Sequence, residues 1–334
     1  MPAATDIGID LGTSTIVVYV KGKGIILREP ALAAFDKDKN MVVAFGDEAR
    51  SRLEHNSGNL LALHPLKGGV ISDFLVTEKM LQYFIQKSMG HFRLFKPHIV
   101  LCIPSGVTEI EKRAVEEAAY QAGARDVVLV PEPVAAAMGA GIDVLRPSGS
   151  MVVSVGGGIT EIAVISLAGI VVSQSIQVGG DSFNQAVLQY VRDVYGLFIG
   201  EQTAEEIKIH IGTADREKRL DHAEIRGRDI HTGTPRTISM TSDQVREAVE
   251  KPVRQIADAV HVVLERTPPD LAADIAERGI LLAGGGAQLN GLAEVIHKDT
   301  GIAVMMAENP ETAVARGTGV YIRNINVMDK TYHV

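Results

Sequence analysis

Apolar residues, many of them β-branched, recur along this chain in short runs bounded by glycine, proline or charged residues. Runs of this kind predict β-strands. The expected strands are Ile7–Ile9, Ile16–Val20, Gly24–Leu27, Ile99–Ile103, Val127–Val130, Met151–Val155, Glu161–Ser166, Ile170–Ser175 and Ile280–Leu282.

Between these runs the apolar positions change to helical spacing, and two of the helices carry a start signal. Thr108 with Glu111, and Thr203 with Glu206, form the Thr-x-x-Glu capping box, in which the side chains satisfy free backbone N–H groups. A glycine follows the end of each helical pattern. We therefore expect one helix to start at each of these two threonines.

A longer helical pattern runs from about Thr241 to Arg266 and contains Pro252. Because proline lacks an N–H group and its ring clashes with the preceding turn, we expect a kink or a break near Lys251. Strands that alternate with helices predict an α/β fold with mixed sheets and argue against a β-sandwich. With 334 residues, the chain is long enough for two lobes.

One supersecondary pattern occurs twice, in Ile7–Leu27 and in Met151–Val172. Each copy reads as a strand, a glycine turn, a second strand, a tight turn and a third strand. We expect two related lobes that face one another, with a nucleotide in the cleft between them. The first copy ends its opening strand with Asp10, whereas the second has Ser154 at that place.

The glycine turns are candidate phosphate-binding loops, because glycine lets backbone N–H groups approach an anion closely and hydroxyls can add donors. A third turn lies between a strand and a helix, where the helix N-terminus favours negative charge. None of the three fits the GxxxxGK[ST] pattern of P-loop NTPases. The candidate residues are Gly12, Thr13, Ser14 and Thr15 in the first turn, Gly156, Gly157, Gly158 and Ile159 in the second, and Gly284, Gly285, Gly286, Ala287 and Gln288 in the third.

Four charged residues are candidates for the chemistry of such a site. Asp10 would hold Mg²⁺ through water, with a turn-capping aspartate as the alternative. Glu132 would orient or deprotonate the water that attacks a phosphate, or it would simply start a helix. Glu205 and Lys208 lie three residues apart on one helix face, where they would clasp a ribose and base edge or form a surface pair.

The composition narrows the class of protein. A net charge of −8 argues against a nucleic-acid-binding surface, which needs clustered Lys and Arg. The single cysteine, Cys102, has no internal disulfide partner and lies in an apolar run, so we expect a packed thiol in a reducing compartment. The sequence has no signal pattern and no long uncharged apolar stretch, which predicts a cytosolic protein that does not span a membrane.

Together these motifs resemble the MreB and Mbl family of bacterial actin homologues, from about Asp6 to Tyr321. The resemblance implies an actin-like fold of two lobes with mixed five-stranded sheets and a Mg-ATP site between them. It also implies antiparallel double filaments on the inner face of the cytoplasmic membrane that guide cell-wall elongation. The motifs that carry it are IGIDLGT, KGKGI, PLKGGVISD, IPSGVTEIEKRAVEEAA, EPVAAAMGAG, TAEEIKIHIG, IRGRDI, ERTPPDLAADIAERGILLAGGGA and GTG.

By this resemblance Asp10 and the three turns form the metal and phosphate site, Glu205 and Lys208 lie on the adenosine helix, and Glu132 is the catalytic glutamate. The implied subdomains are IA (1–32, 66–145 and 315–334), IB (33–65), IIA (146–180 and 244–314) and IIB (181–243).

The resemblance also implies peripheral membrane attachment through a short hydrophobic loop. Leu94 and Phe95, flanked by basic residues in HFRLFKPH, suit shallow insertion among anionic lipids, and a core-facing turn is the alternative. The partners implied are further copies of the chain, MreC, RodZ and MreB paralogues.

The second turn departs from the family pattern, which usually reads DIGGGTTE. Ser154 replaces an aspartate and Ile159 replaces a threonine that contacts phosphate. We therefore expect a filament protein that binds ATP and hydrolyses it slowly or not at all. The alternatives are a non-hydrolysing paralogue that copolymerises with an active one and a soluble phosphotransferase on the same fold.

Overall fold

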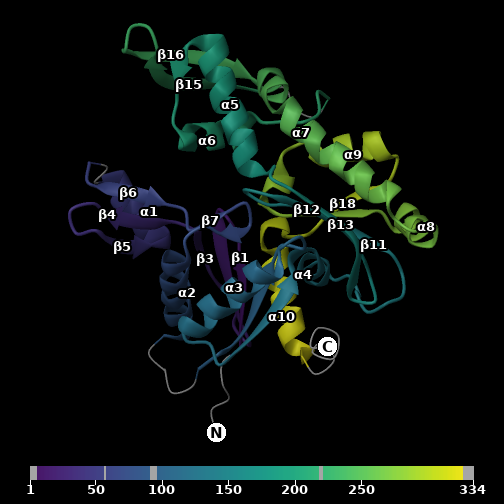
Figure 1. Ribbon diagram of the computed structural model, residues 1–334. Coiled ribbons are helices and arrows are strands. Elements are labelled where there is room, and N and C mark those ends of the chain that lie inside the picture. The colour runs from purple at the N-terminus through teal and green to yellow at the C-terminus, as the bar shows by residue number, and fades with distance from the viewer. Residues whose placement is uncertain (1–5, 56–57, 91–95, 218–220, 326–334) are drawn as a thin grey trace.

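The computed structural model describes residues 6–55, 58–90, 96–217 and 221–325, and two five-stranded mixed sheets form its centre (Figure 1). In the first sheet β1 pairs antiparallel with β2 and parallel with β9. Its strands, in spatial order, are β10 (Asp126–Pro131), β9 (His98–Ile103), β1 (Asp6–Leu11), β2 (Thr15–Val20) and β3 (Gly24–Pro30).

The second sheet repeats this topology strand for strand, because β11 pairs antiparallel with β12 and parallel with β17. Its strands, in order, are β13 (Gly169–Ile176), β12 (Thr160–Ser166), β11 (Ser150–Val155), β17 (Ile280–Ala283) and β18 (Val304–Met306). The repeat seen in the sequence is therefore a repeat of structure. All nine strands expected from the sequence are confirmed.

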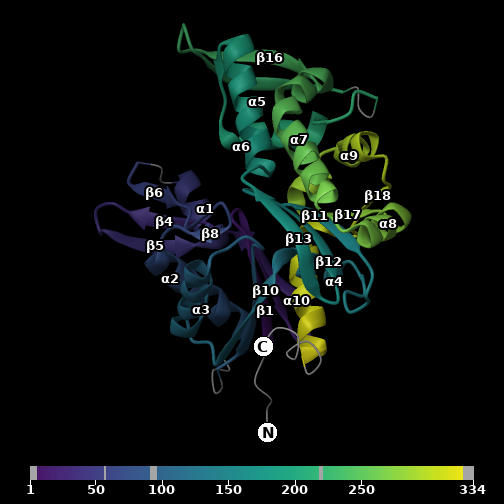
Figure 2. The same cartoon turned by 45° about the vertical axis from the view of Figure 1, so that its right-hand side comes forward.

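Two helices, α4 (Glu132–Gly139) and α10 (Ala313–Arg323), pack against each other between the two sheets (Figures 1 and 2). Their contact is close: a Cβ on Gly317 would lie 1.8 Å from the backbone oxygen of Ala135. Their apolar side chains share one buried cluster with residues of both sheets, including Val100 and Val152. The two lobes thus share one buried apolar cluster around α4 and α10.

The remaining helices cover the outer faces. In the first lobe α2 (Phe74–Met89) and α3 (Glu109–Gln121) pack on the sheet, and α1 (Gly46–His55) packs on a small sheet of β5 (Met41–Phe45), β4 (Ala33–Asp36) and β6 (Leu60–Leu63). A short hairpin joins β7 (Leu66–Lys67) to β8 (Val70–Ile71).

The second lobe carries α5 (Gly180–Tyr195), α6 (Glu201–Ile211) and α7 (Ser242–Glu265), with a sheet of β14 (Leu197–Phe198), β15 (His222–Asp229) and β16 (Pro235–Thr241) at its far end (Figure 1). It also holds α8 (Pro269–Arg278), α9 (Leu292–Thr300) and the 3₁₀ turns η1 (Gly285–Gln288) and η2 (Pro310–Thr312).

The helix predictions are partly corrected. The Thr108 capping box is confirmed, with Glu111 N–H donating to the threonine hydroxyl over 3.3 Å. The predicted start at Thr203 is wrong, because α6 begins at Glu201 after Gly200, and Glu201 accepts a hydrogen bond from Gln185 on α5. Of the two alternatives near Lys251, a kink or a break, the break is wrong, and the kink stays a prediction. The proline is buried inside the continuous helix α7, whose long apolar face packs on the second sheet and offsets the lost hydrogen bond.

Within the part of the chain that the structure describes, no helix combines the length and apolar character needed to cross a membrane. Cys102 lies buried in β9. The residue boundaries of the four subdomains stay a prediction.

Candidate functional site

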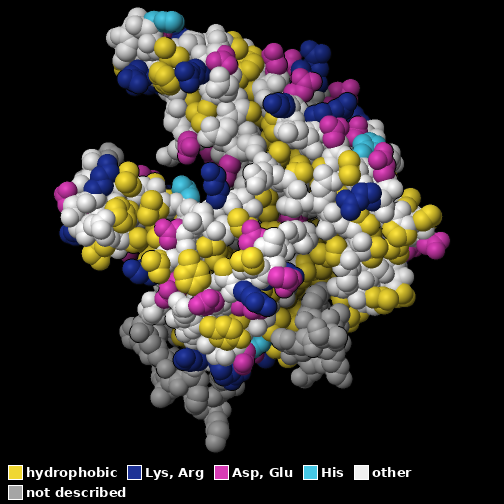
Figure 3. Space-filling model, in the orientation of Figure 1, with side chains coloured by type: hydrophobic (Ala, Val, Ile, Leu, Met, Phe, Trp, Pro, Cys, Tyr) yellow, Lys and Arg dark blue, Asp and Glu magenta, His cyan; other side chains and the backbone are white. Residues whose placement is uncertain are grey.

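A cavity of about 1020 Å³ lies between the two lobes. Figure 3 shows its mouth as a notch on the left, between the part that carries α1 and the part that carries α6. All three glycine turns line this cavity, together with the strand end that carries Asp10, the start of α4 and the inner faces of α5 and α6. The topology thus brings together turns that are about 140 and 130 residues apart in sequence.

The first two glycine turns face one another closely. A Cβ on Gly157 would lie 2.0 Å from Ser14 Oγ, and one on Gly158 would lie 2.9 Å from Thr13 Cγ2. Ser14 Oγ also donates a hydrogen bond of 2.9 Å to Asp181 Oδ2 at the start of α5. Only glycine permits this approach, so the two turns present their backbones to the same small volume.

The first turn follows β1, which ends in Asp10 and Leu11. Thr13 Oγ1 accepts a hydrogen bond of 3.0 Å from Gly69 N–H, in the hairpin between β7 and β8. Sequence reasoning missed Gly69, although two adjacent glycines in PLKGGVISD were a signal of a special turn. Asp10, Gly12, Thr13, Ser14 and Thr15 all line the cavity, and their proposed roles stay predictions.

In the second turn Ser154 occupies the place that Asp10 has in the first. Its side chain is buried, and its Oγ donates a hydrogen bond of 2.9 Å to Glu132 Oε1 at the start of α4. Ile159 is also buried and lies against the Gly69 turn, where its Cδ1 would be 2.8 Å from an added Cβ. The serine therefore engages the candidate catalytic glutamate directly.

Two carboxyl groups at the base of the cavity, Asp10 and Glu132, are strongly desolvated. Burial raises the pKa of Asp10 to about 7. Burial, with the negative charges of Asp10 and Glu161 nearby, raises the pKa of Glu132 to about 8, and the Ser154 hydrogen bond lowers it in part. A cation beside these two carboxylates would offset the free-energy cost of burying their negative charge.

Glu161 is a further buried carboxylate that sequence reasoning did not assign to the site. It is fully buried in β12, opposite Ser154, and its Oε2 accepts hydrogen bonds from Ser105 N–H (2.8 Å) and Ser105 Oγ (2.5 Å). The available signal was a charged residue in an otherwise apolar strand. Since Ser105 follows β9 of the first sheet, this contact joins the lobes at the base of the cavity.

The candidate adenosine helix α6 presents Glu205 and Lys208 to the cavity. Lys208 Nζ lies 2.7 Å from Glu205 Oε2, and the same carboxylate oxygen accepts from Asn184 Nδ2 over 2.5 Å. Lys208 is only 12% exposed and also donates to Gly180 O over 3.4 Å. Both residues therefore line the cleft, with Glu205 44% exposed, and the choice between a ribose clasp and a surface pair stays a prediction. Asn184, on α5, was missed.

The third turn is held against the second. Gly284 has φ +88°, and a Cβ there would lie 2.2 Å from Val155 O. Gly284, Gly285, Gly286 and Gln288 line the cavity, whereas Ala287 is fully buried and is not among the lining residues.

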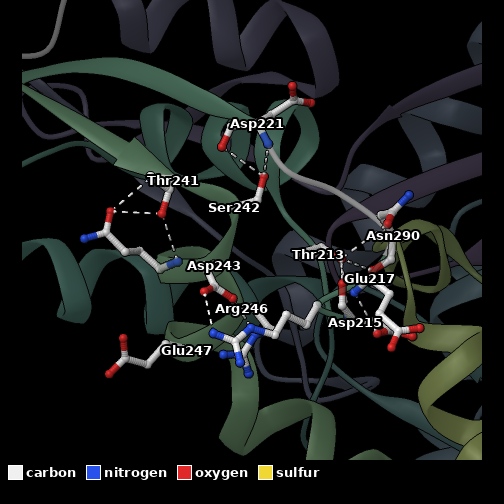
Figure 4. A network of polar contacts seen from close by, with 12 residues as sticks. Thr213, Asp215, Glu217, Asp221, Thr241, Ser242, Asp243, Arg246, Glu247 and Asn290 are labelled. Atoms are coloured by element: carbon white, nitrogen blue, oxygen red, sulfur yellow. Dashed lines mark hydrogen bonds and ion pairs between the residues drawn. The ribbon is translucent and has the colours of Figure 1, made fainter.

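A polar network ties this third turn to the end of α6 (Figure 4). Ala214 N–H donates to Asn290 O over 2.7 Å, and Thr213 Oγ1 donates to Asn290 Oδ1 over 3.3 Å. Behind it, Lys298 Nζ lies 2.9 Å from Asp215 Oδ2. The two walls of the candidate adenosine pocket are thus fixed relative to each other.

Magnesium is the metal that the resemblance implies. No group of three His, Cys, Asp or Glu side chains within the described ranges could hold a metal ion by itself. The desolvated Asp10 carboxyl still fits a Mg²⁺ that is held mainly by polyphosphate and water, since such sites use one or two carboxylates. Leu94 and Phe95, the candidate membrane contact, lie outside the described residues.

Two sheets of one topology, joined through α4 and α10 around a cavity lined by three glycine turns, define a protein of the actin-like fold class. A solved structure of MreB 5 of Spiroplasma citri bound to AMPPNP superposes with a TM-score of 0.93 at 32% identity, covering 99% of both chains. The MamK double helical filament shares the fold, with a TM-score of 0.81 at 21% identity over 96% of this chain and 99% of that chain.

The sequence comparison gives the family. The model of the MreB/Mbl protein family matches residues 4–330. The cell shape-determining protein Mbl of Bacillus subtilis is 47% identical over 98% of both chains, and MreB of Escherichia coli is 47% identical over 97% of this chain and 95% of its own. The chain belongs to the MreB/Mbl family of bacterial actin homologues.

Proposed function

We propose that this chain binds Mg-ATP in the interlobe cavity and uses the bound nucleotide to control its assembly into filaments. The observation that carries the proposal is the close approach of Ser14 and Gly157, which turns two glycine loops toward one volume. The structures of Spiroplasma citri MreB5 are described as bound to AMPPNP and to ADP, which supports a nucleotide at this place.

In this proposal the first two turns hold the β- and γ-phosphates, the third turn approaches the sugar and α-phosphate, and Glu205 with Lys208 reads the ribose and base edge. Asp10 would hold Mg²⁺ through water, and the ion would neutralise negative charge on the phosphates. Glu132 would accept a hydrogen bond from the attacking water and so orient it, which is the position that a general base requires.

Hydrolysis is proposed to be slow or absent. Ser154 provides no second carboxylate for metal or water, and its hydroxyl donates to one of the two carboxylate oxygens of Glu132. A carboxylate that already accepts a hydrogen bond is a weaker base. Ile159 supplies a buried methyl group where the family pattern has a hydroxyl donor.

We further propose that the filaments are antiparallel double filaments, peripheral on the inner face of the cytoplasmic membrane, that guide peptidoglycan elongation and so determine cell shape. The names of the Mbl and MreB relatives support the role in cell shape. Leu94 and Phe95 are the proposed lipid contact, and MreC and RodZ are the proposed partners, both by family resemblance.

Electron microscopy and pelleting with anionic liposomes test this function, with and without Mg-ATP, on the unaltered chain and on Leu94→Ser with Phe95→Ser. We expect paired filaments on lipid that need nucleotide, and a double variant that still polymerises but leaves the lipid. Absence of polymer in every condition, despite ATP binding, would rule out self-assembly.

A second candidate function is a non-hydrolysing paralogue that copolymerises with an active MreB and modulates it, favoured by the Ser154–Glu132 hydrogen bond. Mixing the chain with an active relative and measuring phosphate release tests this function. This function would be supported if the two proteins copolymerise and phosphate release per active subunit differs from that of the relative alone. Separate filaments would exclude it.

A further inference from the structure

The ion pair between Arg28 and Glu311 crosses the interlobe cavity. Arg28 Nη1 and Nη2 lie 2.8 and 2.5 Å from Glu311 Oε1 and Oε2, so the contact is bidentate. Arg28 belongs to β3 of the first sheet, and Glu311 belongs to η2, the next element along the chain after β18 of the second. Both side chains line the cavity. The pair therefore forms a bridge between the lobes at the edge of the proposed nucleotide site.

On the first-lobe side the backbone next to Arg28 is firmly held. Glu29 is only 5% exposed, lies 2.6 Å from Lys87 Nζ on α2, and accepts a hydrogen bond from Asp47 N–H over 3.2 Å. Since Asp47 lies in the first turn of α1 and Lys87 in the last turn of α2, Arg28 is anchored to both helices through its neighbour.

On the second-lobe side Glu311 is attached to the third glycine turn. Pro310 O accepts a hydrogen bond from Gly284 N–H over 2.8 Å, and Gln288 Nε2 donates to Glu311 Oε2 over 3.4 Å. Movement of the Glu311 carboxylate would therefore also move the third glycine turn, which would hold the sugar and α-phosphate.

The exposure of the pair argues for a role other than folding stability. The side chains of Arg28 and Glu311 are 50% and 33% exposed, and ion pairs this open to water contribute little to the free energy of unfolding. Their bidentate geometry does resist separation of the two anchors. For the lobes to part at this edge, both hydrogen bonds must break.

We propose that the Arg28–Glu311 pair is an interlobe strap that slows release of the nucleotide by holding the third glycine turn to β3. The inference rests on the proposed nucleotide-binding function and adds a regulation of that site. Salt, or any anion that competes for Arg28, weakens the strap and speeds nucleotide exchange.

Stopped-flow release of a fluorescent ATP analogue tests the strap on the unaltered full chain, Arg28→Ala, Glu311→Ala and the charge swap Arg28→Glu with Glu311→Arg. We expect each alanine variant to release the analogue about three- to fivefold faster, the swap to restore slow release, and added salt to shrink the difference. Arg52→Ala is the matched control, because it removes an Arg–Glu ion pair of 2.6 Å that lies within α1 alone. Unchanged release in the alanine variants, or a swap as fast as they are, overturns the proposal.

A second measurement needs no nucleotide. Dyes on Ser51→Cys and Thr237→Cys, in a Cys102→Ala background, report the distance across the mouth between α1 and β16 (Figure 1). The alanine variants are expected to show lower energy transfer, restored by the swap. If the unaltered chain binds no nucleotide, the proposed function fails. The energy-transfer measurement would still show whether the Arg28–Glu311 pair holds the two lobes together. Equal transfer in all variants would exclude the strap.

Discussion

The two glycine turns that face each other across the cavity have the same backbone plan but are preceded by side chains of different chemistry. The turn between β1 and β2 is preceded by Asp10, a buried carboxyl group with a raised pKa. The turn between β11 and β12 is preceded by Ser154, which donates to Glu132. The two sheets thus share one backbone plan at the proposed phosphate loops, whereas the side chains that would lie near the γ-phosphate differ.

The contrast separates two properties that are usually linked. In the proposed function, nucleotide binding would depend on backbone N–H groups and on the close approach of Gly157 to Ser14, and both turns have these features. Hydrolysis would depend on free carboxylate oxygens near the metal and the water, and only the first turn is preceded by a carboxylate of its own. Each prediction below disturbs one side of this comparison.

The largest effect is expected when the two turns are pushed apart. In Gly157→Ala the new Cβ would lie 2.0 Å from Ser14 Oγ and 2.6 Å from Ser14 Cβ, and because a rotamer change cannot move the Cβ, the turns must separate. We expect ATP affinity to fall at least 100-fold, about 3 kcal/mol, as measured by isothermal calorimetry. Gly169→Ala, at the first residue of β13 in the same sheet, is the control, because its Cβ would come no closer than 3.5 Å to Ser166 O. Equal losses in both variants would contradict the account.

A smaller effect is expected from the carboxylates of the nucleotide-free protein. Because the pKa values of Asp10 and Glu132 are raised to about 7 and about 8, the native chain binds more protons than the unfolded chain between their ordinary and raised values. The free energy of unfolding therefore falls as pH rises through this window. We expect Asp10→Asn and Glu132→Gln to be stabilised relative to the unaltered chain, slightly at pH 4 and by a few kcal/mol above pH 8.

Urea denaturation at several pH values measures this gain. Glu206→Gln is the control, since that glutamate lines the same cavity but is exposed. A gain that does not change with pH would show that the Asp10 and Glu132 carboxyls are not desolvated in the native state.

The smallest effect is expected from the serine itself. Ser154→Ala removes the donor to Glu132 Oε1, which should lower the free energy of unfolding by about 1 kcal/mol at pH 8 and above, where Glu132 ionises. A double-mutant cycle with Glu132→Ala isolates the interaction. Additive losses in the cycle would mean that the hydrogen bond contributes nothing.

The sequence predicted the parts of the molecule that depend on local pattern. The strands follow from β-branched runs and the turns from glycine clusters. The pairing of the two copies follows from the repeat itself. The start of α6 was misplaced, because Glu201 and Gln202 are good helix formers that extend the helix ahead of the Thr203 signal.

The rest depends on contacts between residues far apart in sequence. Ser14 with Asp181, Ser105 with Glu161, and Arg28 with Glu311 meet only because α4 and α10 bring the two sheets together. Neither the periodicity nor the spacing of residues in the sequence predicts such long-range contacts. Ala287 shows the same limit at short range: its turn was found from the sequence, but the direction of its side chain into the core was not.

Steady-state phosphate release, compared between the unaltered chain and Ser154→Asp with Ile159→Thr, tests the central claim most directly. We predict that the double variant releases phosphate at least about tenfold faster while ATP affinity stays similar, and that adding Glu132→Gln removes the gain. Equal release by the unaltered chain and the double variant would contradict the claim that the second turn limits hydrolysis.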